Sequence, residues 1–284
     1  MKRAVVVYLE CKRSLMMQFA CLYTSFKFVN PKDTDLVVFG TKEAHALIPN
    51  DCIKVEYNPL SEPKKWLEHR YINSISCFVG EAADFLDSYD YILKSDVDTF
   101  LTPSFKSYFP ENYCVGKGGY VYTDEVKQRI KHIAKRFNLR HQGIHNIGST
   151  QYGRPQLLKK VCALSVMVAN HIMFEEFKDG PGDWPGWYQG VTLMYSGEIA
   201  VNHFIENICL DIEKLDYDST SSNSIFEHPH IHCWHNDNMF SKFKFVEGSY
   251  DKLDITNIKL DKIKDYCLYI ALKSRRDMPW LGEC

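Results

Sequence analysis

Two carboxylates separated by one residue, Asp96 and Asp98, are the side chains whose types and spacing most directly indicate chemistry. They follow the apolar run Tyr91–Leu93 and precede Phe100 and Leu101. Carboxylate oxygens are hard ligands that suit Mg²⁺ or Mn²⁺ better than metals that prefer thiolates. A divalent ion held there can neutralise a departing diphosphate. The pattern predicts a metal site, and the alternative is a pair of exposed turn acids.

The elements that must position this pair alternate between strand and helix through the first hundred residues. Apolar runs predict buried strands at Ala4–Leu9, Leu36–Phe39, Ile53–Tyr57 and Tyr89–Leu93. Helical spacing predicts one helix across residues 15–26 and another that opens at Pro63 and continues to Leu86. This alternation predicts βαβ units in a mainly parallel sheet, where ligands bind beyond the carboxyl ends of strands.

The pattern is looser after residue 100. We predict an amphipathic helix at 126–137, a helix at 187–207 and a last helix at 261–273. A stretch rich in glycine and proline, residues 179–187, lies between the first two. The sequence contains no internal repeat and no clear linker, which favours a single domain.

Composition excludes several classes of protein. The 284 residues carry 34 basic and 36 acidic side chains, a net charge of −2, which provides no bulk attraction for nucleic acid. The hydrophobic fraction of 45% is that of an ordinary globular protein with a sizeable core. We therefore expect no nucleic-acid partner.

Membrane insertion and export are also not expected. The longest apolar run, Val161–Phe174, contains Asn170 and His171 and is shorter than a membrane-spanning helix requires. The ten cysteines are spread along the chain without a CxxC pair, and no Asn-x-Ser/Thr acceptor occurs. These features predict reduced thiols, a cytoplasmic location and no transmembrane segment.

The segment YDYILKSDVDTFLTP, residues 89–103, resembles the Asp-x-Asp motif and its flanks in the GT-A family of nucleotide-sugar glycosyltransferases. The resemblance covers residues 4–245 in the order of elements, although only this segment is specific. It implies an α/β fold with a Rossmann-like nucleotide-binding half, a mainly parallel central sheet and an irregular acceptor-binding half. It implies one catalytic domain at 1–284, divided into a nucleotide-binding half (1–103), an acceptor and metal half (104–250) and a C-terminal helix and tail (251–284).

The resemblance also implies a late histidine as third metal ligand. Four histidines fall within residues 228–235, and an extended chain would put His230 and His232 on one face and His235 on the other. We predict His232 as the ligand, with His230 and His235 as alternatives. A Zn²⁺ site is a competing interpretation, but Cys233 is the only nearby thiol. Structural or surface histidines are the other alternative.

The resemblance assigns further side chains to the donor nucleotide. Asp98 would be the main metal ligand, while Asp96 would contact the ribose or the metal. Arg70 and Asn73 precede the motif strand, where family members often bind uracil or diphosphate. Lys242 could meet the diphosphate as a point charge, and Lys94, which directly precedes the motif, is a further candidate for binding the nucleotide. Surface roles are the alternative for Arg70 and Lys94, and an exposed strand is the alternative for Lys242 and its neighbours.

Sugar transfer with inversion requires a carboxylate general base beside the acceptor hydroxyl. Asp183 is our first candidate, because inverting GT-A enzymes often hold their base just before a helix like that predicted at 187–207. Glu198 is the second candidate, because a carboxylate within an apolar helix is rarely buried unless it has a partner or a function. Its alternative role is to pair with His203 or another nearby donor.

Aromatic side chains in the glycine- and proline-rich stretch are candidates for sugar binding. Trp184, Trp187 and Tyr188 could stack on sugar rings, and such a loop could act as a lid. The small polar segment 146–150 would let the backbone approach a sugar closely. The alternatives are a surface loop whose tryptophans fold into the core, and an ordinary turn at 146–150.

Within the GT-A family, the chain is similar in size and style to soluble glycosyltransferases encoded by large algal viruses, which build capsid N-glycans in the host cytoplasm. This narrower similarity implies UDP-xylose as donor, an inverting reaction and a fucose hydroxyl of a viral N-glycan as acceptor. The resemblance to GT-A enzymes thus implies a pentosyl- or hexosyltransferase that requires Mn²⁺ or Mg²⁺.

Two rival functions fit parts of the same sequence. Residues 96–99 also match the D-x-D-x-T phrase of haloacid-dehalogenase-type phosphatases, although that motif normally ends the first strand. A non-catalytic carbohydrate-binding protein would use Trp184 and Trp187 but would need neither Asp96 nor Asp98.

Overall fold

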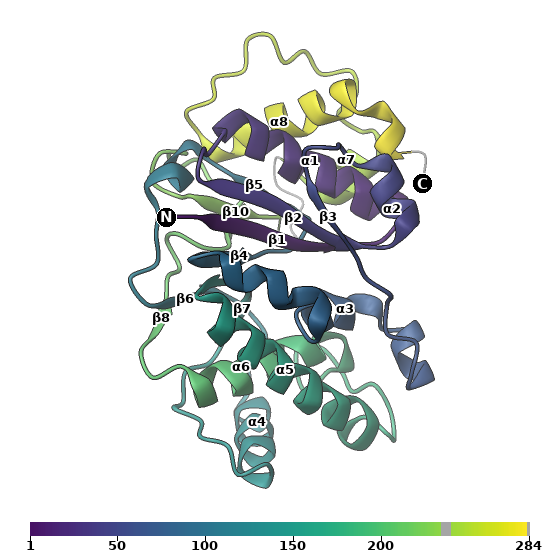
Figure 1. The fold of residues 1–284 in the computed structure, drawn as a ribbon, viewed down its shortest axis with the longest axis vertical. Helices are drawn as coiled ribbons and strands as arrows, with labels where there is room; N and C mark the ends of the chain where they lie inside the picture. Colours follow the sequence, from purple (N-terminus) through teal and green to yellow (C-terminus); the bar gives the residue numbers. More distant parts are fainter. Residues whose placement is uncertain (234–239, 283–284) are drawn as a thin grey trace. The chain divides into compact units, whose positions relative to one another are not determined.

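The computed structural model describes residues 1–233 and 240–282 (Figure 1). The chain divides into two compact units of interleaved segments. Unit 1 comprises residues 1–58, 95–109 and 211–284, and unit 2 comprises residues 59–94 and 110–210. The single catalytic domain and its three parts stay a prediction.

Unit 1 contains three parallel strands in the order β3-β2-β1: β1 (Arg3–Leu9), β2 (Thr34–Gly40) and β3 (Ile53–Glu56). Helix α1 (Arg13–Val29) connects β1 to β2, and α2 (Lys42–Leu47) connects β2 to β3. Six of the seven residues of β1 are buried, as expected for a strand in a parallel sheet. The buried strands predicted at 4–9 and 36–39 and the first predicted helix are thereby confirmed. Residues 53–56 also form the predicted strand, but none of them is buried.

A second, smaller sheet of unit 1 has the strand order β5-β10-β9, formed by β5 (Thr99–Leu101), β9 (Tyr217–Asp218) and β10 (His230–His232). Strand β10 is antiparallel to β5 and parallel to β9. Helices α7 (Lys242–Glu247) and α8 (Ile263–Asp277) follow, with 3₁₀ turns η4 (Pro103–Ser107) and η7 (Pro279–Gly282). In Figure 1, α8 lies beside α1, and buried side chains of both helices join Phe100 and Ile231 in one hydrophobic cluster.

Unit 2 contains four strands in the order β4-β7-β6-β8: β4 (Tyr91–Lys94), β6 (Tyr113–Lys117), β7 (Ile147–Gly153) and β8 (Ile208–Leu210). Strand β7 is antiparallel to β4 and β6, whereas β8 is parallel to β6. Its helices are α3 (Asn73–Ser76), α4 (Asp124–Arg136), α5 (Pro155–His171) and α6 (Thr192–Phe204). Short helical turns are η1 (Lys64–Leu67), η2 (Arg70–Ile72), η3 (Glu81–Ser88), the π-helical η5 (Ile172–Glu176) and η6 (Gln189–Val191).

The seven-stranded sheet has the strand order β3-β2-β1-β4-β7-β6-β8. The predicted α/β fold with a mainly parallel central sheet is confirmed. Strand β7 is antiparallel to both of its neighbours, β4 and β6, and the sequence did not predict this direction.

One local prediction is wrong. Residues 63–86 form no continuous helix but the short helical segments η1, η2, α3 and η3. Gly80, with a φ of 99°, interrupts the helical backbone between α3 and η3. Asn146 is in the left-handed region at a φ of 59°, and residues 147–150 are the first four residues of strand β7, so the alternative of an ordinary turn at 146–150 is wrong. The approach of this backbone to a sugar stays a prediction.

One described helix, Pro155–Glu176, is long and apolar enough by composition to cross a membrane. It comprises α5 and η5, and 44% of its most apolar window is buried inside the protein. The buried side chains of α5 include Leu158, Val161 and Val168, and α5 packs against α6.

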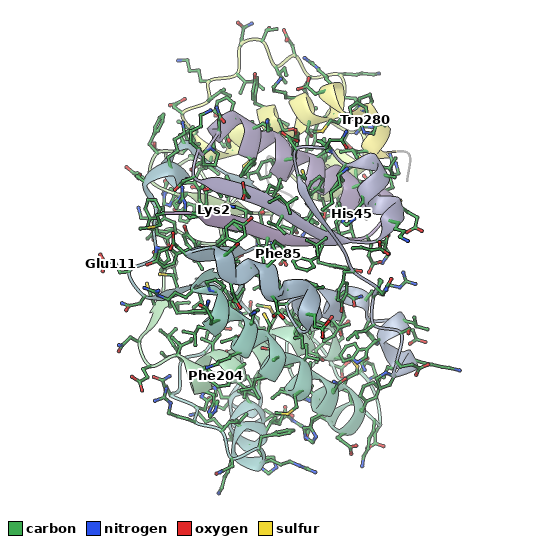
Figure 2. All side chains as sticks on the ribbon, viewed as in Figure 1. Lys2, His45, Phe85, Glu111, Phe204 and Trp280 are labelled. Atoms are coloured by element: carbon green, nitrogen blue, oxygen red, sulfur yellow. The ribbon has the colours of Figure 1, made fainter. Side chains whose placement is uncertain are left out.

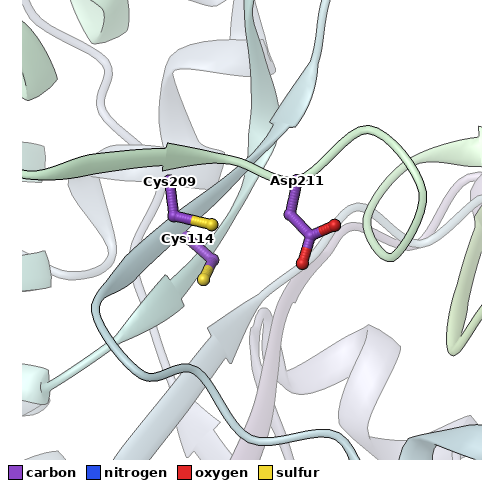
Figure 3. Close-up of side chains that lie close together, drawn as sticks. All are labelled: Cys114, Cys209 and Asp211. Carbon is purple, nitrogen blue, oxygen red and sulfur yellow. The ribbon is translucent and has the colours of Figure 1, made fainter.

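Most described cysteines are free thiols, as predicted. They are Cys21, Cys52, Cys77, Cys114, Cys162, Cys209, Cys233 and Cys267. Figure 3 shows two of them, Cys114 on β6 and Cys209 on β8, which are partners in the strand register, together with Asp211. The prediction that the thiols are reduced is wrong for Cys11, because its sulfur is in a disulfide bond.

Some large apolar side chains remain at the surface. Phe85, Phe204 and Trp280 are labelled in Figure 2 and are exposed. Trp280 nevertheless donates a hydrogen bond from Nε1 to the carbonyl of Leu47, 3.0 Å away. Single exposed rings of this kind are normal on a globular surface.

Candidate metal and nucleotide site

The Asp-x-Asp motif lies in unit 1, in the tight turn between Ser95 and β5. The backbone N–H of Ser95 donates to the carbonyl of Val6 in β1 at 3.0 Å. Thr99 closes the turn, because its Oγ1 donates to the carbonyl of Asp96 at 2.8 Å. The turn therefore holds the carboxylates of Asp96 and Asp98 at a fixed position relative to β1.

Strand pairing brings His232 to the same place. In the antiparallel pair of β5 and β10, His232 is opposite Thr99, and the N–H of Cys233 donates to the carbonyl of Asp98 at 3.0 Å. Nε2 of His232 lies 3.3 Å from Oδ1 of Asp98 and 4.0 Å from Oδ2 of Asp96. The structure thus brings together the three side chains that the sequence predicts as metal ligands.

The chemistry of this donor set fits a divalent ion. One ligand atom from each of Asp96, Asp98 and His232 lies within 4.8 Å of the others. Two carboxylates and one imidazole suit Mn²⁺ or Mg²⁺, and the set contains no thiolate. Asp96 is 30% exposed whereas Asp98 is 13% exposed, so the site is accessible from the Asp96 side.

Charges compensate one another closely in this site. Burial lowers the pKa of His232, but the neighbouring Asp98 and Asp216 outweigh burial and raise that pKa well above its usual value. Burial raises the pKa of Asp98, but His232 and then Lys242 hold it well below its usual range. Without a metal ion, protonated His232 and Lys242 therefore neutralise Asp98.

Lys242 begins helix α7, where Ser241 is the N-cap residue. Its Nζ donates to Oδ2 of Asp98, and the side chain is largely buried. Residues 242–247 are therefore helical and do not form the exposed strand that was the alternative. A fixed ammonium group beside the carboxylates is suitably placed to meet an anionic ligand.

Sequence reasoning missed the residues behind the ligands. Asp216 is buried, and its Oδ1 lies 3.1 Å from Nδ1 of His232. His230, one of the alternative ligands, instead has Nε2 2.9 Å from Oγ of Ser95. No spacing links Asp216 to the motif, so only strand pairing could reveal it. His235, the other alternative, lies outside the described residues.

The predicted donor residues of unit 2 have varied surroundings. Lys94 is buried, and its Nζ donates to the carbonyl of Ser149 at 2.9 Å. Asn73 is buried, and its Oδ1 accepts from the N–H of Leu60 at 2.9 Å. Arg70 is exposed on η2, and its Nε donates to the carbonyl of Leu67. Their contacts with a nucleotide stay predictions.

The two candidate bases, also in unit 2, differ sharply. Asp183 is exposed in the loop that precedes η6 and α6. Glu198 is fully buried in α6. Its Oε2 accepts from the hydroxyl of Tyr120 and from the N–H of Asn146, both at 2.7 Å, and its Oε1 lies 2.6 Å from Nδ1 of His145. Burial raises the pKa of Glu198, but hydrogen bonds from histidines and Tyr120 lower it overall.

The aromatic residues of the same loop are divided between core and surface. Trp187 is buried and stacks between Phe177 and Tyr195, at centroid distances of 5.3 and 4.2 Å. Trp184 is 49% exposed and meets the exposed ring of Tyr122 edge to face, with centroids 5.6 Å apart. Trp187 therefore anchors the loop, while Trp184 faces solvent.

Comparison with solved structures identifies the class of fold. The apo structure of the bifunctional glycosyltransferase WbbM matches 99% of this chain at 12% identity with a TM-score of 0.51, and the match covers 51% of that protein, about half its length. The galactosyltransferase LgtC, in complex with donor and acceptor sugar analogs, matches 73% of this chain and 72% of its own at 14% identity, with a TM-score of 0.43. An active-site mutant of LgtC matches the same shares at 12% identity, with a TM-score of 0.44.

The likeness to WbbM and the mainly parallel sheet show that the fold is of the glycosyltransferase GT-A type. The chain belongs to the family described as domain of unknown function DUF7164, whose model matches residues 1–279. A search of curated protein sequences finds no significant match.

Proposed function

We propose that this protein is a metal-dependent glycosyltransferase that moves a sugar from a UDP-sugar to a hydroxyl group of a glycan. The observation that carries the proposal is the meeting of Asp96, Asp98 and His232 in unit 1 of a GT-A-type fold. A hard donor set on this fold suits the diphosphate of a nucleotide-sugar.

Asp96, Asp98 and His232 would hold Mn²⁺ or Mg²⁺, which would neutralise the negative charge that develops on the diphosphate leaving group. Lys242 would turn from Asp98 toward the diphosphate and add a second positive charge. Asp98 would no longer need Lys242 as its partner once the metal ion is bound. The chain's own cations would thus exchange partners during binding.

The acceptor hydroxyl would lose its proton to Asp183 in an inverting reaction. Asp183 suits this role better than Glu198, because its carboxylate is exposed in a loop next to Trp184. Glu198 is enclosed by three donors and is unavailable to a substrate hydroxyl. Its network confirms the alternative that Glu198 pairs with a nearby donor, although the donors are Tyr120, Asn146 and His145 and not His203.

We further propose UDP-xylose as donor and fucose of a viral N-glycan as acceptor, in a cytoplasmic setting. The similarity of the sequence to soluble algal-virus glycosyltransferases supports this choice. A panel of UDP-sugars, followed by product analysis by NMR, would identify the donor and the stereochemistry.

The rival functions lack comparable support. A phosphatase of the D-x-D-x-T class would use Asp96 as its nucleophile, whereas the fold here is of the glycosyltransferase type. A carbohydrate-binding protein without catalysis would have no use for the arrangement of Asp98, His232 and Lys242.

Calorimetric titration of UDP in the presence of Mn²⁺ tests the proposal. We expect binding that EDTA abolishes and that Asp98→Asn weakens by about 100-fold or more, since the variant loses a charged metal ligand. The matched control is Asp124→Asn, which removes an exposed acid at the start of α4 and should bind like the wild type. Absence of UDP binding by the wild type with Mn²⁺ would overturn the proposed donor.

A further inference from the structure

Asp216 occupies an unusual backbone position directly before β9. Its φ is 55°, in the left-handed region, and it is buried. Among residues with a Cβ, Asp and Asn adopt this conformation most readily, and such residues cluster at functional sites. This conformation lets the main chain and the side chain of Asp216 each face one of the two histidines of β10.

The side chain of Asp216 faces His232. Its Oδ1 lies 3.1 Å from Nδ1 of His232, and a carboxylate oxygen at this distance accepts a hydrogen bond from the N–H group at Nδ1. A bound metal ion would displace the proton from Nε2, and the proton kept on Nδ1 would leave the lone pair of Nε2 available on the opposite edge of the ring. That edge is the one directed at Asp98, 3.3 Å away.

The main chain of Asp216 faces His230. Its N–H donates to Nδ1 of His230 at 3.2 Å, so this nitrogen acts as an acceptor and the ring proton resides on Nε2. Nε2 then donates to Oγ of Ser95 at 2.9 Å, and Ser95 begins the motif turn. One residue thus sets opposite tautomers in two histidines of one strand.

We propose that Asp216 is the positioning residue of the metal site: its carboxylate holds His232 as the Nδ1–H tautomer with Nε2 available to the metal, and its main chain holds His230 against the motif turn. Part of this inference rests on the proposed function, because it assumes that His232 binds a metal ion. Loss of a carboxylate that orients a metal-binding imidazole typically lowers metal affinity by about 10- to 100-fold, and we expect the same range for Asp216.

The variant Asp216→Asn tests the proposal. Asn tolerates the left-handed backbone and matches the shape of Asp, but it lacks the charge and can present an N–H group to Nδ1 of His232. We expect calorimetry with Mn²⁺ alone to show affinity about 10- to 100-fold lower than that of the wild type. The melting temperature controls for folding.

Asp218→Asn is the matched control, because it removes the same charge two residues along. Asp218 is opposite His232 in the register of β9 and β10, but its carboxylate accepts from Thr220. We expect Asp218→Asn to bind Mn²⁺ as the wild type does. An equal loss of Mn²⁺ affinity in both variants would mean that the loss comes from the removal of a negative charge near the site, and it would overturn the positioning role of Asp216.

Nitrogen-15 NMR of the histidine rings gives a readout that a merely structural role would not move. In wild-type protein saturated with Mg²⁺ we expect a proton on Nδ1 of His232, and in metal-free protein at neutral pH a proton on Nε2 of His230. Asp216→Asn should change the signals of His232 and leave the tautomer of His230 intact. A proton on Nδ1 of His230 in the wild type would overturn the main-chain part of the proposal.

The outcomes separate this inference from the proposed function. If the wild type binds neither Mn²⁺ nor UDP, the proposed function fails and the metal role of Asp216 fails with it. If the wild type binds both and Asp216→Asn binds Mn²⁺ equally well, only the present inference fails.

Discussion

At the scale of single residues, the buried carboxylates of Asp98 and Glu198 have two different kinds of partner. Asp98 is neutralised by the cations His232 and Lys242, which an incoming metal ion can replace. Glu198 is held by hydrogen-bond donors within unit 2, including the Tyr120 hydroxyl, the Asn146 N–H and the ring of His145. The first arrangement is exchangeable, whereas the second is structural.

The two candidate bases, exposed Asp183 and buried Glu198, should respond differently to substitution. Asp183→Asn should lower kcat by about 100- to 10,000-fold without changing the melting temperature, as removal of a general base does. Glu198→Gln should instead lower the free energy of unfolding by about 2 kcal/mol, since it weakens charge-assisted hydrogen bonds in the core. Turnover assays and denaturant titrations check both. A normal kcat in Asp183→Asn would eliminate Asp183 as the base.

His230 predicts how stability depends on pH. Burial lowers its pKa from 6.5 to about 4, so the unfolded chain takes up a proton at a higher pH than the folded chain does. The stabilising contribution is therefore complete above pH 6.5 and is lost as the pH falls toward 4. A shift of this size corresponds to about 3 kcal/mol.

Denaturant titrations at several pH values between 7.5 and 4 would measure this effect. We expect the free energy of unfolding of His230→Gln to fall less over this range than that of the wild type, by about 3 kcal/mol. Identical pH profiles for the two proteins would contradict the assignment to His230.

At the scale of elements, the loop before η6 combines rigidity and exposure. Trp187 fixes the loop to the core through its stacked neighbours Phe177 and Tyr195. Trp184, three residues earlier, presents its ring to solvent beside Tyr122. An anchored loop with an exposed aromatic face is suited to bind a sugar ring of the acceptor.

The two tryptophans should therefore respond differently to substitution. Trp187→Ala should lower the free energy of unfolding by about 3 to 5 kcal/mol, since it leaves a cavity. Trp184→Ala should leave stability unchanged and raise the acceptor KM by about tenfold, the equivalent of one aromatic contact. Thermal melts and acceptor titrations check this, with Trp280→Ala, an exposed ring of unit 1, as control. Unchanged acceptor KM in Trp184→Ala would remove this residue from the acceptor site.

At the scale of the whole molecule, the chain crosses between its units repeatedly. The candidate metal site of unit 1 combines a short segment around Asp98 with the late segment that contains Asp216 and His232. These segments are held together by pairing of β5 with β10 and of β10 with β9. An ion bound by both segments should therefore stabilise the folded chain.

Thermal unfolding with and without Mn²⁺ tests this stabilisation. At a free concentration about 100 times the dissociation constant, binding to the folded state alone contributes about 2.7 kcal/mol. We expect the melting temperature to rise by several degrees, and EDTA to reverse the rise. Asp98→Asn should show almost no rise, and an equal rise in that variant would place the ion elsewhere.

The sequence by itself determined the features that depend on local patterns. Continuous apolar runs predicted β1, β2 and β4, because strands buried on both faces need such runs. Helical periodicity predicted α1, α4, α6 and α8 for the same kind of reason. The predicted strand at β3 forms at the edge of the sheet, although none of its residues is buried. The carboxylate pair after an apolar strand was also readable from the sequence, since a motif within one turn involves only neighbours.

Only the tertiary structure decided the features that depend on distant partners. The failure of the predicted helix at 63–86 and the antiparallel direction of β7 were not encoded in apolar spacing. The sequence named His232, but strand pairing put it opposite Thr99 and gave it Asp216 as partner. Hydrogen bonds between segments far apart in the chain fix these positions, and residue spacing carries no record of such bonds.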